Sequence, residues 1–141
     1  FFSIFLDRIF YMEKIFKNLI IASVVVWAIY IIIAFLYPDS LLPEELAAIQ
    51  NANIDKLGDM FLLFSLLMTI LVFVTYYLIY KFKKIGRTIF LMLVLLTFPL
   101  VIYMGPQILH PIDQLVNYFI PVLDGALLTL MYASPLKNRF S

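Results

Sequence analysis

Asp124 is the residue with the clearest chemical demand, because its carboxyl group lies inside a long apolar stretch, eight residues before Tyr132. A carboxylate in a membrane interior is costly unless it is protonated, paired or hydrated. No basic residue lies at the same depth. We therefore expect Asp124 to be largely protonated at neutral pH and to face other helices.

A polar stripe leads to Asp124 along one face of the same predicted helix. At about 100° per residue, four side chains fall within about 60°; they are His110, Asp113, Asn117 and Asp124. Pro121 lacks an N–H group, so the carbonyl of Asn117 loses its usual helical partner. The oxygens of this stripe could hold a proton, a cation or a polar ligand. Alternatively, Asp124 only donates a hydrogen bond to a neighbouring helix, as polar residues in lipid commonly do.

Depth along the predicted helices indicates which side chains can meet Asp124. A count of about 12 Å from the helix ends, at 1.5 Å per residue, brings Trp27 to its level and Thr97 close to it. Trp27 is either packing bulk or an N–H donor to Asp124. The candidates for binding a ligand or a proton are therefore Asp124, Asn117, Trp27 and Thr97.

Other kinds of chemistry have little support in this chain. There is no cysteine, one histidine and a net charge of only +1, so we expect no thiolate site and no nucleic-acid partner. His110 and Asp113 would supply only two metal ligands, whereas a site needs three or four. No catalytic or phosphate-binding motif is present. We expect no enzyme activity, no cofactor and no bound metal.

The elements that position these residues are membrane helices. Of the 141 residues, 65% are hydrophobic and 13% are charged, against about 25% charged in a typical soluble domain. Four apolar segments have roughly the 20 residues that cross a bilayer. They span residues 19–37, 58–80, 88–104 and 114–132. Because lone strands cannot satisfy their backbone in lipid, the fold class is all-α, a four-helix membrane bundle.

The basic residues predict how the bundle is oriented. Nine of the ten Lys and Arg residues flank the same ends of the four segments. The positive-inside rule places these ends, and both chain termini, in the cytoplasm. The cluster Lys81, Lys83, Lys84 and Arg87 marks this side, and could also contact anionic lipid head groups.

The remaining segments are assigned from local signals. Residues 1–18 are expected to form an interfacial segment and residues 133–141 a cytoplasmic tail, while proline and acidic residues predict a short outer interfacial helix over about 43–53. Pro99 and Pro121 should kink their helices, and Gly125 should permit close helix approach. Tyr76, Tyr77 and Tyr80 are interpreted as an interfacial aromatic belt.

The general layout also suggests a location and a role. Four helices followed by Tyr132–Leu136 and basic residues resemble small bacterial inner-membrane proteins, which implies that location. We expect a non-enzymatic accessory or scaffold subunit that contacts lipids and packs against other membrane chains or itself. A small oligomeric channel or transporter using Asp124 is the second hypothesis. It differs from small multidrug transporters, because the first helix has no carboxylate over 19–37.

Overall fold

The computed structural model describes residues 2–36, 43–104 and 111–140, and all of its regular elements are helical. The helices are α1 (Phe2–Leu36), α2 (Glu44–Tyr80), α3 (Lys84–Met104) and α4 (Pro111–Ala133), followed by the short 3-10 helix η1 (Pro135–Arg139). Each long helix contains a stretch long and apolar enough to cross a membrane. These stretches are Asp7–Ile33, Gly58–Tyr80, Lys84–Tyr103 and Pro111–Ala133.

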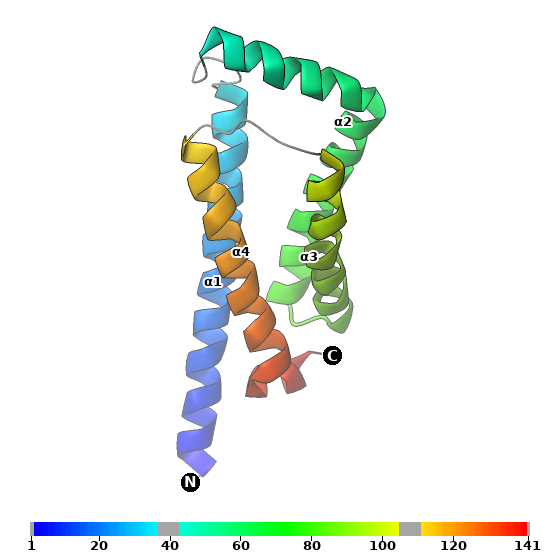
Figure 1. The fold of residues 1–141 in the computed structure, drawn as a ribbon. Coiled ribbons are helices and arrows are strands. Elements are labelled where there is room, and N and C mark those ends of the chain that lie inside the picture. Colours follow the sequence, from blue (N-terminus) through cyan, green and yellow to red (C-terminus); the bar gives the residue numbers. More distant parts are fainter. Residues whose placement is uncertain (1, 37–42, 105–110, 141) are drawn as a thin grey trace.

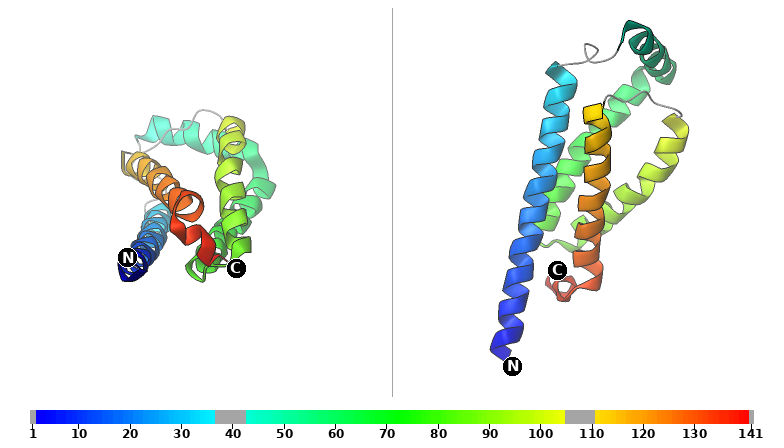
Figure 2. Two further views of the ribbon diagram at one scale, coloured as in Figure 1. Left: turned by 90° about the horizontal axis from the view of Figure 1, so that it is seen from below. Right: turned by 60° about the vertical axis from the view of Figure 1, so that its left-hand side comes forward.

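The long helices form two pairs that meet at one end. α1 packs along α4, and α2 packs along α3, while the contacts between the two pairs are fewer. Figure 1 shows the two pairs side by side, with the C-terminus at the end where they join. The same arrangement is visible after rotation in Figure 2. We call this joined end the base of the molecule.

α1 is continuous across residue 18, where an interfacial segment was expected to end. The helix runs without a break from Phe2 to Leu36, since no proline or glycine interrupts it. Phe16 is fully buried and Ile20 is 3% exposed. The C-terminal part of segment 1–18 therefore contributes to the core of the bundle.

α2 is divided into two arms by Gly58. Its backbone adopts φ 72° and ψ 171°, a conformation that glycine reaches without the cost a side chain would add. The first arm lies across the end of the molecule opposite the base, and the second arm runs toward the base (Figure 1). The helix expected over 43–53 corresponds in position to this first arm, which begins at Glu44 and continues to the kink.

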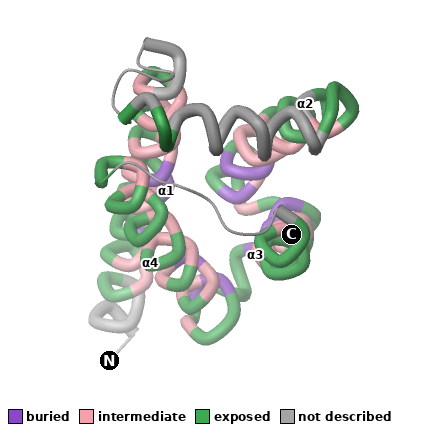
Figure 3. Tube along the Cα trace, turned by 45° about the horizontal axis from the view of Figure 1, so that its top comes forward, coloured by how far each residue is buried: buried purple, intermediate pink, exposed green. Residues whose placement is uncertain are grey.

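The core lies at the base and includes the chain's C-terminal segment. Its buried side chains come from all four long helices and from η1 and its flank: Phe16, Ile20, Tyr76, Ile79, Phe90, Leu127, Met131, Leu136 and Phe140. Figure 3 marks where these buried positions occur along the chain. The rings of Phe16, Phe82 and Phe140 pack with centroids 5.2 to 5.9 Å apart. Residues 133–140, within the segment 133–141 expected as a tail, thus fold back because Leu136 and Phe140 bury apolar surface there.

One expectation about local packing needs correction, while the kinks expected at Pro99 and Pro121 stay predictions. Nothing lies within 4 Å of a Cβ built on Gly125, so this glycine does not mediate close approach within the chain. Gly86 does, because a Cβ there would lie 2.6 Å from Cβ of Leu78. The turn between α2 and α3 brings Gly86 of α3 against Leu78 of α2. α3 and α4 stay helical through Pro99 and Pro121, and Gly58 is the residue at which a described helix has non-helical torsions.

Candidate functional site: a polar cluster around Asp124

Asp124 of α4 is bound by a tyrosine from another helix. The Tyr76 hydroxyl, on α2, donates a hydrogen bond to Oδ1 of Asp124 at 3.1 Å. Tyr76 is only 2% exposed, and Asp124 is partly buried. The contact joins residues 48 positions apart in sequence and links the two helix pairs just above the apolar core.

α1 completes this cluster with Ser23 and Trp27. Both side chains lie close to the Tyr76 hydroxyl. An indole N–H can only donate, so Tyr76 can accept from Trp27 while it donates to Asp124. The hydroxyl of Ser23, a residue 1% exposed, donates its one hydrogen to the Leu19 carbonyl at 3.0 Å. The cluster therefore gathers polar groups from three helices around one tyrosine oxygen.

Trp27, expected to be either packing bulk or a donor to Asp124, lies close to Tyr76. Its ring packs edge-on against Tyr30, with centroids 6.0 Å apart. Tyr30 in turn lies close enough to Asp113 for the two to interact electrostatically. α1 thus presents aromatic polar groups toward two of the acidic residues of the α4 stripe.

The other predicted stripe and ligand residues are not brought to the cluster. Asn117 is exposed on α4. Thr97 is exposed on α3, and its hydroxyl bonds to the Val94 carbonyl of its own helix. His110 lies outside the described residues. The structure therefore assembles Asp124 and Trp27 around Tyr76, and leaves Asn117 and Thr97 apart.

Tyr76 is the member of the site that sequence reasoning missed. Its assignment to an interfacial aromatic belt is wrong, because Tyr76 is buried whereas Tyr77 is 61% exposed. The same count along the second apolar segment, eight residues from its end at Tyr80, brings Val72 and not Tyr76 to the level of Asp124. Helical side chains tilt toward the helix N-terminus, so a long tyrosine about one turn nearer the base reaches that level. A count that included side-chain length would have found it.

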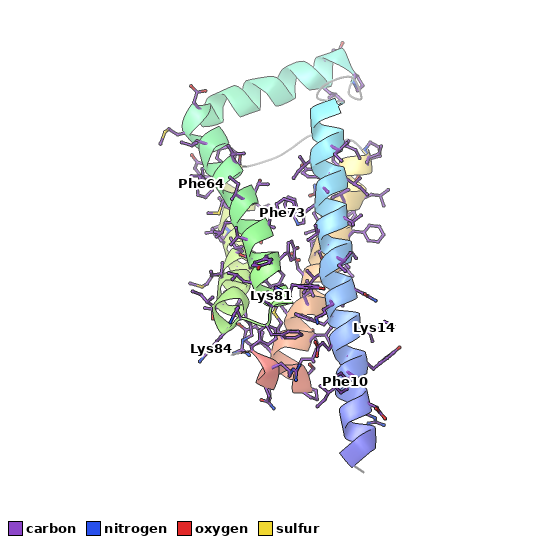
Figure 4. All side chains as sticks on the ribbon, turned by 180° about the vertical axis from the view of Figure 1, so that it is seen from behind. Phe10, Lys14, Phe64, Phe73, Lys81 and Lys84 are labelled. Carbon is purple, nitrogen blue, oxygen red and sulfur yellow. The ribbon has the colours of Figure 1, made fainter. Side chains whose placement is uncertain are left out.

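The predicted lipid-contact cluster divides into two parts in the structure. Lys81, Lys83 and Lys84 are exposed at the base, where Figure 4 labels Lys81 and Lys84. Arg87 instead turns toward the end of α4, where its Nη1 donates to the carbonyls of Met131 at 3.5 Å and Lys137 at 3.4 Å. Its guanidinium also lies 4.8 Å from the centroid of Tyr132. A cation here complements the negative end of the helix dipole.

A network of charged groups fastens α1 to the C-terminal segment. Glu13 accepts from Lys17 Nζ at 2.9 Å and from Arg139 Nη2 at 3.2 Å. The Glu13 side chain is 16% exposed, so the pairing is partly shielded from solvent. Together with Arg87, these contacts close the base around the core and support the cluster above it.

The arrangement can hold helices together and can hold one exchangeable proton near Asp124. Hydroxyl and indole groups supply hydrogen bonds, but the cluster has one carboxyl group. Within the part of the chain that the structure describes, no three His, Asp or Glu side chains gather as metal ligands. Comparison of the chain with protein-family models, with curated proteins and with solved structures gave no match.

Proposed function

We propose that this chain is a non-enzymatic integral membrane protein that serves as an accessory or scaffold subunit of a membrane complex. The proposed location is a bacterial inner membrane, with both termini in the cytoplasm. The observation that carries the proposal is the internal closure of the Asp124 site. Because Tyr76 supplies the hydrogen bond from within the chain, Asp124 serves to tie helices and needs no ligand to be accommodated.

The distribution of the core also supports a packing role. The buried residues concentrate at the base, while the halves of the helices away from it keep large apolar side chains uncovered. α3 illustrates this, since Phe98, Val101 and Ile102 are each at least 66% exposed. Lipid or other apolar helices would cover such faces in a membrane. Exposed Lys81, Lys83 and Lys84 would contact anionic lipid head groups at the cytoplasmic surface.

A small oligomeric channel or transporter is the second candidate, and one observation favours it. Asn117 shares a helical face with Asp124 and is exposed, without a hydrogen bond among the residues that the structure describes. In an oligomer, Asn117 and Asp124 would line one polar path. Self-association alone does not distinguish the two functions, whereas ion flux does.

The test combines purification with a flux assay. The chain is extracted in mild detergent, its partners are identified, and the purified protein is placed in vesicles for proton and cation flux measurements. The accessory role predicts a stable unlike membrane protein in the complex and no flux above empty vesicles. Robust flux that disappears in Asp124→Ala, with Thr97→Ala as a matched control, would overturn the accessory role in favour of transport.

A further inference from the structure

One exposed face of α4 combines amide, hydroxyl and small residues inside a stretch that is otherwise apolar. Five residues fall within a sector of about 100° of the helix; they are Gln114, Asn117, Tyr118, Pro121 and Gly125. All five are exposed, and we call them the α4 polar face. On α4, the α4 polar face is adjacent to the face that carries Asp124 and Met131.

The polar groups on this face lack partners that other polar groups of the bundle possess. Neither amide, of Gln114 or Asn117, has a hydrogen bond within the described part of the chain. In contrast, exposed Thr69, Thr97 and Thr129 donate to carbonyls of their own helices. A side-chain amide must satisfy both donors and acceptors. By helical rise, Asn117 lies about 9 Å beyond Pro111, within the span.

From these observations we infer that the α4 polar face binds the same face of a second copy of this chain. The inference rests on the membrane placement under the proposed function. An amide both donates and accepts, so two Asn117 side chains related by a two-fold axis satisfy each other. Gly125 has open space around its Cα, so nothing prevents close approach of a second α4. The face is thus self-complementary in chemistry and shape.

Disulfide cross-linking tests this interface directly, since the chain has no cysteine. Single cysteines are introduced along α4 at 114, 117, 118, 121 and 125, with Leu115→Cys and Phe119→Cys as controls, both exposed outside this face. After mild oxidation in native membranes, we expect covalent dimers at the first set and few at the controls. Equal cross-linking at all positions, or a maximum at the controls, would overturn the inference.

Outcomes of the same experiment separate this inference from the proposed function. Release of the chain by alkaline washing would show that it is not integral, and the proposed function would fail. An inserted chain that cross-links to an unlike protein through this face would overturn self-association while leaving the accessory role intact. Dimers of the chain, together with no ion flux in vesicles, would support both self-association through this face and the accessory role.

A second pair of variants addresses the energetic contribution of Asn117. We expect Asn117→Leu to weaken dimerisation in detergent about three- to tenfold, the usual range for hydrogen bonds between membrane helices. Thr97→Val is the matched control, because its hydroxyl is satisfied within α3. The monomer fold should survive, since Asn117 makes no described contact to lose. Unchanged dimerisation in Asn117→Leu would contradict the assignment of this face.

Discussion

At the scale of single residues, the contact between Tyr76 and Asp124 explains how an acidic residue is accommodated between the helices. The carboxyl oxygen accepts from a buried hydroxyl, and Ser23 and Trp27 lie close to that hydroxyl. The cluster therefore brings polar groups of three helices together around one hydrogen bond between helices. In an apolar medium such groups are costly when left alone, so each holds the others in place.

This reasoning predicts unequal effects of two nearly isosteric changes. Asp124→Asn retains an acceptor for the Tyr76 hydroxyl and should leave folding nearly intact if Asp124 is normally protonated. Tyr76→Phe removes the donor and should lower the free energy of unfolding by about 1–2 kcal/mol. Unfolding in mixed detergent measures both, with exposed Tyr77→Phe as the control. A severe folding defect in Asp124→Asn, together with a tolerated Asp124→Glu, would show that the charge itself is required.

Gly86 provides a second prediction at this scale. An added Cβ would lie 2.6 Å from Cβ of Leu78 and 3.0 Å from the backbone nitrogen of Ile79, so the α2–α3 turn must shift. We expect Gly86→Ala to destabilise the protein by about 1–3 kcal/mol, the usual range for overpacking. Gly125→Ala is the matched control because its site is open. Equal stability of the two variants, measured by thermal unfolding in detergent, would contradict the packing described.

At the scale of elements, η1 and its flanking residues act as the closing piece of the base. Ser134 caps η1 through a hydrogen bond from the Leu136 backbone N–H at 3.1 Å. This turn directs Leu136 and Phe140 into the core, while Arg139 pairs with Glu13 on α1. A segment of few residues thereby contacts the first helix of the chain.

The importance of this element is testable with one core substitution. Leu136 is fully buried, so Leu136→Ala should lower the free energy of unfolding by about 2–5 kcal/mol through lost packing. Lys137→Ala, at an exposed neighbouring position, should have little effect. Protease sensitivity and thermal unfolding in detergent measure the difference. If both variants unfold alike, the segment is not part of the stabilising core.

At the scale of the whole molecule, two helix pairs share one base and differ in the residues that they carry. In the first pair, α4 carries Asp113, Asn117 and Asp124 of the polar stripe, and in the second pair α2 carries Tyr76 and α3 carries Gly86. Phe73 projects from α2 toward the α1–α4 pair in Figure 4. The pairs are joined by the core and the polar cluster, so a change at the base should affect all four helices together.

The distribution of charge predicts one orientation of this molecule in the membrane. The base carries the exposed basic groups of Lys81, Lys83 and Lys84, so we expect it to face the cytoplasm. Cysteine placed at Asn51 should react with an impermeant reagent in intact cells, and cysteine at Asn138 should not. The opposite labelling pattern would mean that the orientation is inverted. Labelling after permeabilisation provides the control for reactivity of both sites.

The sequence by itself determined the helical class, the number of long apolar segments and the beginning of the second one at Gly58. These properties are local, because the length of an apolar run and the freedom of a glycine can be evaluated without knowing any neighbour. The special status of Asp124 was equally local, since the cost of a carboxyl group depends on the apolar residues around it in sequence. The identity of its hydrogen-bond partner was not local, because Tyr76 lies 48 positions away in sequence.

Only the tertiary structure decided that Tyr76 binds Asp124, that Arg87 caps α4, and that the chain end enters the core. Each of these contacts joins residues far apart in sequence. They depend on the rotation and relative height of packed helices, which hydropathy does not specify. For the same reason Asn117 shares a helical face with Asp124 yet remains exposed, since α3 and α4 make few contacts in the part of the chain that the structure describes.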